Sequence, residues 1–139
     1  MNFIFNNAIK IYLGILLAII LFHLCIITKI IPYDITWGGR LTNDIEMYVF
    51  ETISILINIL LSWVLLMKGN LVKYKFPNQV VNIILWVFFA IFILNTAGNI
   101  FAKTFFEKQF AFLTALSSLL LWIILKKKKN NIPLTEENI

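Results

Sequence analysis

Ionisable residues are scarce in this chain. Charged residues make up 14% of its 139 residues, whereas a soluble domain usually carries about a quarter. Histidine and cysteine occur once each, as His23 and Cys25. A single cysteine excludes an intramolecular disulfide and a multi-thiolate metal site, and a single histidine excludes the usual multi-histidine metal centre. We therefore expect neither a bound metal nor a cofactor.

Common catalytic motifs are missing as well. The sequence contains no G-x-x-x-x-G-K-[ST] or G-x-G-x-x-G motif for nucleotides, no H-E-x-x-H zinc motif and no G-x-S-x-G nucleophile elbow. Their absence favours a protein without catalytic activity. It leaves open an enzyme that depends on acid–base chemistry, with Glu51 and His23 as its catalytic candidates.

Apolar residues, in contrast, are abundant and come in four long blocks. They account for 60% of the chain, and the blocks cover residues 11–28, 47–67, 80–100 and 109–125. Each block is close to the roughly 20 residues that a helix needs to cross a bilayer. We predict an all-α, polytopic membrane protein, an antiparallel four-helix transmembrane bundle. It forms one domain over residues 1–129, followed by a polar C-terminal tail at residues 130–139.

Basic residues are unevenly distributed between the two sides of this predicted bundle. The side that holds both termini carries Lys10, Lys68, Lys73, Lys75, Lys126, Lys127, Lys128 and Lys129. The other side carries Lys29, Arg40, Lys103 and Lys108. Because cytoplasmic loops hold the excess of lysine and arginine, we expect both termini in the cytoplasm. The net charge of +5 then belongs to a membrane surface, and we expect no nucleic-acid partner.

The first connection, residues 29–46, is the longest and has the most distinctive sequence. Pro32 is expected to end the first helix, and the glycine pair at positions 38 and 39 permits a turn with positive φ. We expect an ordered loop that packs over the outer end of the bundle through Tyr33 and Trp37.

Two helix starts carry capping signals. Asn43 and Glu46 have the spacing of a capping box for the second helix. Pro77 followed by Asn78 indicates a stop and then a cap for the third helix. These signals predict where the second and third helices begin.

Glu51 is the most informative residue because it lies inside a run that otherwise has the composition of a membrane span. A carboxyl group is expensive there, and such residues tend to face the bundle interior and to serve a function. At about 100° per residue, Asn58 and Ser62 each lie within roughly 20° of Glu51 on the helix surface. The second helix is therefore predicted to carry a polar stripe.

Polar side chains on all four predicted helices lie at a similar depth below the outer surface. Counting at about 1.5 Å per residue places Glu51 and His23 roughly 6–12 Å below it, with Asn95 and Thr114 at a comparable level. Each unsatisfied polar group in lipid costs several kcal/mol, so we expect these groups to share a chamber beneath the first loop. The predicted ligand-binding residues are His23, Trp37, Arg40, Glu51, Asn58, Asn95, Asn99 and Thr114.

Each of these residues also has a purely structural interpretation. Glu51 can be a carboxyl group held by hydrogen bonds, His23 a satisfied core histidine, and Arg40 or Trp37 an interfacial anchor. Asn95 and Asn99 can serve only to fix helix register. The sequence leaves the protonation state and the partner of Glu51 open.

Three functions fit this pattern. The first is a pocket that binds a membrane lipid or another hydrophobic small molecule, with Glu51 as its polar anchor. The second is an accessory or assembly subunit, in which the stripe of Asn58 and Ser62 binds a partner membrane protein or a second copy of the chain. The third is an isomerase or transferase of lipid-like substrates, in which Glu51 and His23 exchange a proton.

The first loop and the second helix carry a family resemblance. The segment 31–41 contains Pro-Tyr-Asp-x-x-Trp-Gly-Gly-Arg, and Glu51 lies ten residues beyond it. This pattern resembles a group of small bacterial four-helix membrane proteins without an assigned activity. The resemblance implies a multi-pass protein of the bacterial inner (cytoplasmic) membrane and no specific reaction. More loosely, the chain is similar to emopamil-binding and sigma-2-receptor-like proteins, bundles with acidic residues and a histidine in an intramembrane pocket.

Overall fold

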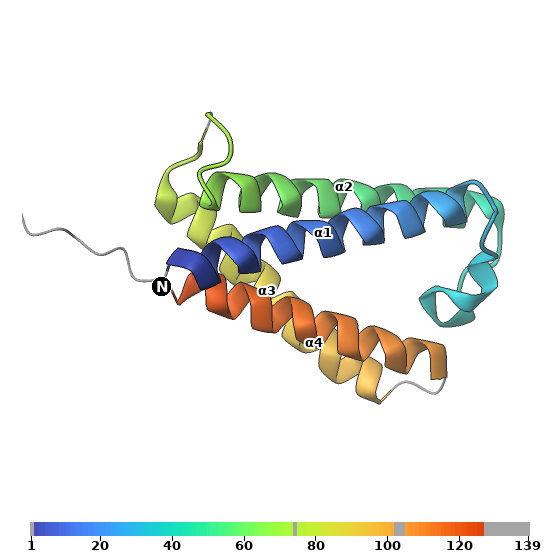
Figure 1. Ribbon diagram of the computed structural model, residues 1–139. Coiled ribbons are helices and arrows are strands. Elements are labelled where there is room, and N and C mark those ends of the chain that lie inside the picture. The colour runs from blue at the N-terminus through green and yellow to red at the C-terminus, as the bar shows by residue number, and fades with distance from the viewer. Residues whose placement is uncertain (1, 74, 102–104, 127–139) are drawn as a thin grey trace, which may run out of the picture.

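Four long helices dominate the chain. The computed structural model describes residues 2–73, 75–101 and 105–126. The helices are α1 (Asn2–Ile27), α2 (Asp44–Lys68), α3 (Asn78–Ile100) and α4 (Phe105–Leu125), and the 3-10 turns η1 (Tyr33–Ile35) and η2 (Trp37–Gly39) lie between α1 and α2. The helices form two antiparallel hairpins, α1–α2 and α3–α4 (Figure 1). The predicted all-α antiparallel four-helix bundle is confirmed.

Each helix is long and apolar enough to cross a membrane. The shortest, α4, has 21 residues and the longest, α1, has 26. Large apolar side chains cover the outside of the bundle, and Leu94 of α3, for example, is 72% exposed. Water would disfavour so large an apolar surface, whereas lipid accommodates it. The chain is therefore a small polytopic membrane protein with four candidate spans.

The helices extend beyond the predicted apolar blocks. α1 begins at Asn2 and α2 at Asp44, whereas the blocks begin at residues 11 and 47. Polar residues such as Lys10 continue a helical backbone without belonging to an apolar run, so the blocks mark only the central part of each helix. The predicted tail at 130–139, together with Lys103 and residues 127–129, lies outside the described residues.

α1 ends earlier than predicted, in a Schellman motif rather than at Pro32. Lys29 adopts a φ of 58°, and its backbone N–H donates to Ile26 O at 2.8 Å. The Ile30 N–H donates to Cys25 O at 2.9 Å, which completes the motif. The last carbonyls of α1 are thus satisfied before the chain reaches the proline, and Pro32 instead caps η1.

The predicted N-terminal cap is present at α2 but not at α3. Asn43 caps α2 as predicted, since its side chain accepts from the Glu46 N–H at 2.9 Å. The Glu46 carboxylate accepts from the Thr42 N–H at 2.9 Å, one residue earlier than in a standard capping box. At α3 the cap is Pro77, and Asn78 is already helical and makes no capping bond. The prediction of Asn78 as the cap is therefore wrong.

The two ends of the bundle are packed differently. We call the end with the start of α1 and the end of α4 the terminal end, and the opposite end, with the α1–α2 and α3–α4 connections, the loop end. At the terminal end the four helices share one apolar core, whose fully buried members include Tyr12, Leu65, Leu85 and Leu121. Toward the loop end the two hairpins diverge (Figure 1).

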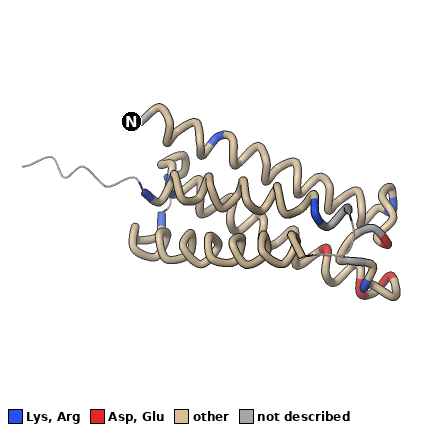
Figure 2. The backbone as a smooth tube through the Cα atoms, turned by 90° about the horizontal axis from the view of Figure 1, so that it is seen from below, with Lys and Arg blue, Asp and Glu red and all other residues tan. Residues whose placement is uncertain are grey.

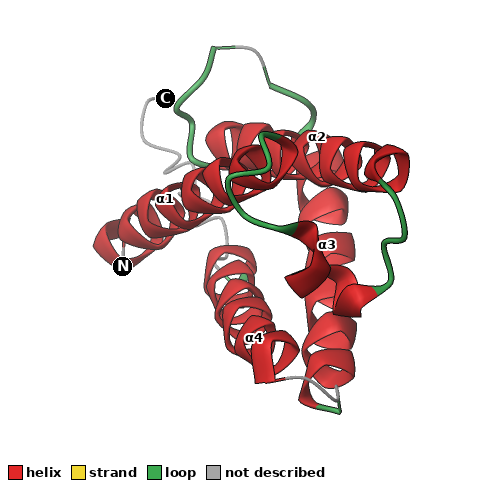
Figure 3. Ribbon diagram, turned by 90° about the vertical axis from the view of Figure 1, so that its right-hand side faces the viewer, coloured by secondary structure: helices red, strands yellow, loops and turns green. Residues whose placement is uncertain are grey.

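A small second cluster fixes the α1–α2 connection to the loop end. Ile26 of α1, Leu41 of the connection and Met47 of α2 are buried together, and Tyr33 packs against them. Held in this way, the η1–η2 loop projects over the space between the two hairpins (Figure 3).

Acidic residues gather at the loop end of the bundle (Figure 2). They include Asp34, Asp44, Glu46 and Glu51. The Lys29 ammonium donates to Asp44 Oδ2 at 2.5 Å. This hydrogen bond with Asp44 raises the pKa of Lys29, so the pair ties the end of α1 to the start of α2.

Candidate functional site

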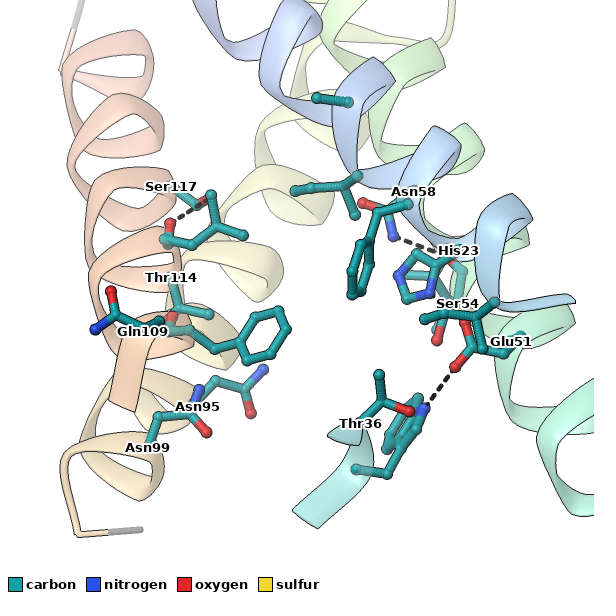
Figure 4. A pocket seen from close by; sticks show the side chains of 18 of the residues that line it. His23, Thr36, Glu51, Ser54, Asn58, Asn95, Asn99, Gln109, Thr114 and Ser117 are labelled. Carbon is teal, nitrogen blue, oxygen red and sulfur yellow. Dashed lines mark hydrogen bonds and ion pairs between the residues drawn. The ribbon is translucent and has the colours of Figure 1, made fainter. Parts of the chain in front are cut away.

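A cavity of about 940 Å³ lies among the four helices at the loop end, beneath the η1–η2 loop (Figure 4). Its polar lining consists of His23, Thr36, Trp37, Arg40, Glu51, Ser54, Asn58, Asn95, Asn99, Gln109, Thr114 and Ser117. The rest of the lining is apolar and is formed by Ile15, Ala18, Ile19, Phe22, Ile26, Ile57, Phe92, Phe110 and Leu113. Its size is at the upper end of the range for pockets that hold drug-sized ligands, about 300–1,000 Å³.

Glu51 lies at one wall of this cavity and is completely buried. Its Oε1 accepts a hydrogen bond from the Trp37 indole N–H at 2.9 Å. Its Oε2 lies 2.5 Å from His23 Nδ1. Two bare lone pairs repel each other at that distance, so a proton must lie between these two atoms. Both carboxylate oxygens are therefore already engaged by ring nitrogens of the protein.

His23 presents the accessible side of this cluster. It comes from α1, its side chain is 15% exposed, and its ring packs edge-to-face on Phe22 at a centroid distance of 6.0 Å. Because Nδ1 faces Glu51, Nε2 is the ring nitrogen that remains for another partner. Within residues 2–73, 75–101 and 105–126, Nε2 makes no hydrogen bond. A carboxylate beside one imidazole nitrogen fixes the orientation of the ring.

Trp37 is brought to Glu51 by an unusual loop conformation. Its φ is 53° and that of Gly39 is 67°, both in the left-handed region that most residues avoid. The Thr36 hydroxyl donates to Tyr33 O at 2.8 Å, and the Trp37 ring packs against Phe50 of α2 at 5.0 Å. The predicted positive φ is confirmed at Gly39. The structure adds a strained tryptophan, a feature that often marks functional positions.

Side-chain amides form the opposite wall. Asn95 and Asn99 lie one turn apart on α3, and Gln109 lies on α4, facing the Glu51 side across the cavity (Figure 4). Among the described residues these three amides have no hydrogen-bond partner. Thr114, in contrast, donates to Phe110 O at 2.9 Å. The amides are therefore free to bind a polar group in the cavity.

The predicted polar stripe of α2 points into the bundle. Asn58 lines the cavity, and its amide nitrogen donates to Ser54 O of the same helix at 2.8 Å. The Ser62 hydroxyl donates to Asn58 O at 2.8 Å and is partly buried. Both side chains thus use these donors within their own helix.

All eight residues predicted to bind a ligand line this one cavity; their role in binding stays a prediction. Four further polar residues belong to the lining, namely Thr36, Ser54, Gln109 and Ser117. Ser54 and Ser117 follow Glu51 and Thr114 by three residues, so helical spacing could have identified them. Whether Thr36 and Gln109 line the cavity depends on the path of the loop and on the angle of α4. The sequence has no signal for either.

The described residues contain no group of three His, Cys, Asp or Glu side chains that could hold a metal ion. What the lining offers is one imidazole, one buried carboxylate, one guanidinium and several neutral amides and hydroxyls. Such a set can bind a polar group and move protons.

Comparison of the chain with protein-family models, with curated proteins and with solved structures finds no match.

Proposed function

We propose that this protein binds a lipid or another hydrophobic small molecule in the loop-end cavity. The polar residues of its lining at the loop end, next to the cluster of Glu51, His23 and Trp37, serve as the anchor for the polar part of the ligand. The observation that carries this proposal is a buried carboxyl group whose oxygens lie against two ring nitrogens, Trp37 Nε1 and His23 Nδ1, beside a cavity of about 940 Å³ that polar and apolar side chains line.

The form of the cavity supports a ligand in this space. The cavity is partly open to its surroundings, so a molecule from the membrane can enter it. The amides of Asn95, Asn99 and Gln109 face the cavity without partners in the part of the chain that is described, and Asn95 and Gln109 are exposed. A ligand with polar atoms at one end and an apolar body would offer partners to these amides and cover the apolar lining.

A cavity-filling substitution tests the proposal. Ala18 of α1 lines the cavity, so Ala18→Trp places an indole inside it. Ala90 of α3 is exposed and does not line the cavity, so Ala90→Trp is the matched control. Native mass spectrometry of protein purified in a mild detergent should detect one small molecule per chain for the wild type and the control, and none for Ala18→Trp. Empty spectra for all three folded proteins would contradict the proposal.

An acid–base enzyme is the second candidate, and one observation favours it. An acid–base pair must lie within hydrogen-bond reach, and His23 Nδ1 lies 2.5 Å from Glu51 Oε2. In this function His23 Nε2 takes a proton from a lipid-like substrate while Glu51 stabilises the imidazolium. Incubation with membrane lipids in D₂O should then incorporate deuterium into one lipid class. His23→Gln should abolish incorporation, and Ser117→Ala should retain it. Equal incorporation by wild type and His23→Gln would remove this candidate.

We propose a bacterial inner membrane, as the resemblance of the first loop implies. We also propose that both termini are cytoplasmic, because basic residues are in excess on that side. An accessory role ranks lower, because Asn58 and Ser62 make their hydrogen bonds inside α2.

A further inference from the structure

The Glu51 carboxyl group is not available to a ligand. The carboxylate is completely buried, and its two oxygens face Trp37 Nε1 and His23 Nδ1. A cationic ligand would have to displace one of these donors to reach it. A buried acidic residue would ordinarily suggest a cationic ligand such as an amine. An amine is nevertheless a poor match for this wall.

Arg40 is the accessible charge of the cavity. The ionisable residues in the lining are His23, Arg40 and Glu51. The ion pairs found among the described residues are His23–Glu51 and Lys29–Asp44. Arg40 takes part in neither and is exposed. Its guanidinium offers five N–H donors in a planar fork that matches a carboxylate or a phosphate.

The amide wall adds neutral donors to this positive charge. Asn95, Asn99 and Gln109 each have an NH₂ group that is not engaged within the described chain. Amide N–H groups and a guanidinium together suit a group that only accepts hydrogen bonds. An ionised carboxylate or phosphate is such a group.

Part of the apolar lining lies deeper in the bundle. Ile15 and Ile19 of α1 and Phe92 of α3 lie closer to the terminal end than Glu51, Asn95 and the loop. Asn58 and Ser117 also line this deeper part, but each donates to a carbonyl of its own helix, whereas Arg40 and the three amides lie nearer the loop end. This arrangement suits a molecule with one polar end and one hydrocarbon chain.

We propose that the cavity takes a single-chain amphiphile whose polar end is an anionic oxygen group, either a carboxylate or a phosphate. Arg40 pairs with the anion, and the amides of Asn95, Asn99 and Gln109 donate to its oxygens. The hydrocarbon chain lies among Ile15, Ile19 and Phe92. This assignment rests on the proposed binding function and specifies its ligand class.

The test compares ligands that share a chain and differ in head group. Palmitate, hexadecyl phosphate, methyl palmitate and hexadecylamine are titrated into delipidated protein in a neutral detergent, and occupancy is measured by native mass spectrometry. Inorganic phosphate serves as the anionic ligand without a hydrocarbon chain. A hydrogen-bonded charge pair corresponds to about a 10- to 100-fold change in affinity, so both anionic amphiphiles should bind at least about tenfold tighter than the ester or the amine. Inorganic phosphate should bind far more weakly than hexadecyl phosphate.

Two variants separate a specific contact from general surface charge. Arg40→Ala should remove the preference for the anions while the ester binds as before. Lys108→Ala removes the same charge from the same end, and Lys108 does not line the cavity, so it should keep the preference. Asn95→Leu, which preserves volume, should weaken the anions by about 10- to 100-fold, the effect of losing one hydrogen bond to a charged group.

The outcomes distinguish this inference from the function on which it rests. Equal binding of palmitate, methyl palmitate and hexadecylamine would overturn the anionic assignment and leave a cavity that binds amphiphiles. Equal losses in Arg40→Ala and Lys108→Ala would also overturn it, because the effect would then be general electrostatics. If the wild type binds no amphiphile at all, the proposed function itself fails. Circular dichroism of each variant confirms that it is folded.

Discussion

Removing His23 alone should destabilise the protein far more than removing His23 and Glu51 together. In His23→Leu, the completely buried Glu51 loses the partner of its Oε2 and keeps only the Trp37 N–H on Oε1. Leucine is close to histidine in volume, so the substitution creates little cavity. The cost therefore comes from a buried carboxylate with one unsatisfied oxygen.

The magnitude follows from that geometry. Breaking a buried charge pair by removing one partner costs about 3–5 kcal/mol, and because Trp37 still donates to Glu51 we expect about 2–4 kcal/mol for His23→Leu. Replacing both members by apolar residues is often about neutral. The Trp37 side chain that is left without an acceptor is 42% exposed, so its N–H can find another partner. We expect His23→Leu/Glu51→Leu to recover most of the loss, with a coupling energy of about 2 kcal/mol.

The assay is reversible unfolding in mixed micelles, titrated with sodium dodecyl sulfate and followed by circular dichroism. Asn58→Leu is the matched control, since its amide also lines the cavity but donates within its own helix; it should cost less than about 1 kcal/mol. Ordinary polar contacts between membrane helices couple by about 0.6 kcal/mol on average. A measured coupling at or below that value would refute the view that His23 and Glu51 form one buried unit.

Three further predictions concern the loop end and the topology. Pairing with Asp44 raises the pKa of Lys29 above its ordinary value of 10.5. The pair therefore stabilises the folded protein fully below pH 10.5, and this stabilisation is lost as the pH rises through the raised pKa. Lys29→Gln should therefore lower the melting temperature slightly at pH 8, and 1 M salt should remove the difference because the pair is exposed. Gly39→Ala should cost about 1–2 kcal/mol, because alanine is disfavoured in the left-handed region where Gly39 has a φ of 67°. Gly98→Ala, in open space on helix α3, should instead be neutral or stabilising, and the opposite result for the two glycines would contradict this reading of the loop. A fluorescent-protein fusion at the C-terminus should fluoresce and an alkaline phosphatase fusion should be inactive in bacteria if both termini are cytoplasmic; the reverse pattern would invert the orientation.

Helix number and antiparallel order could be predicted because the bilayer leaves few alternatives. Apolar blocks of about 20 residues must form helices in lipid, where every backbone polar group needs a partner within its own segment. Individual helix ends were harder to predict. α1 ends in a motif in which Lys29 adopts the left-handed conformation that glycine usually provides. Because a lysine does not signal a helix end, Pro32 is the more visible signal in the sequence, and the prediction that it ends α1 is wrong.

The sequence by itself determined that Glu51 faces inward, and that it shares its level with polar residues of the other helices. Helical spacing and the cost of a polar group in lipid are sufficient for that conclusion. Only the tertiary structure decided which groups meet Glu51. His23 lies 28 residues away in the chain and Trp37 lies 14 away; their contacts depend on the rotation of α1 and on the strained turn of the η1–η2 loop. The cavity is also a tertiary property, because the four helices share a dense apolar core only at the terminal end and the hairpins diverge beyond it.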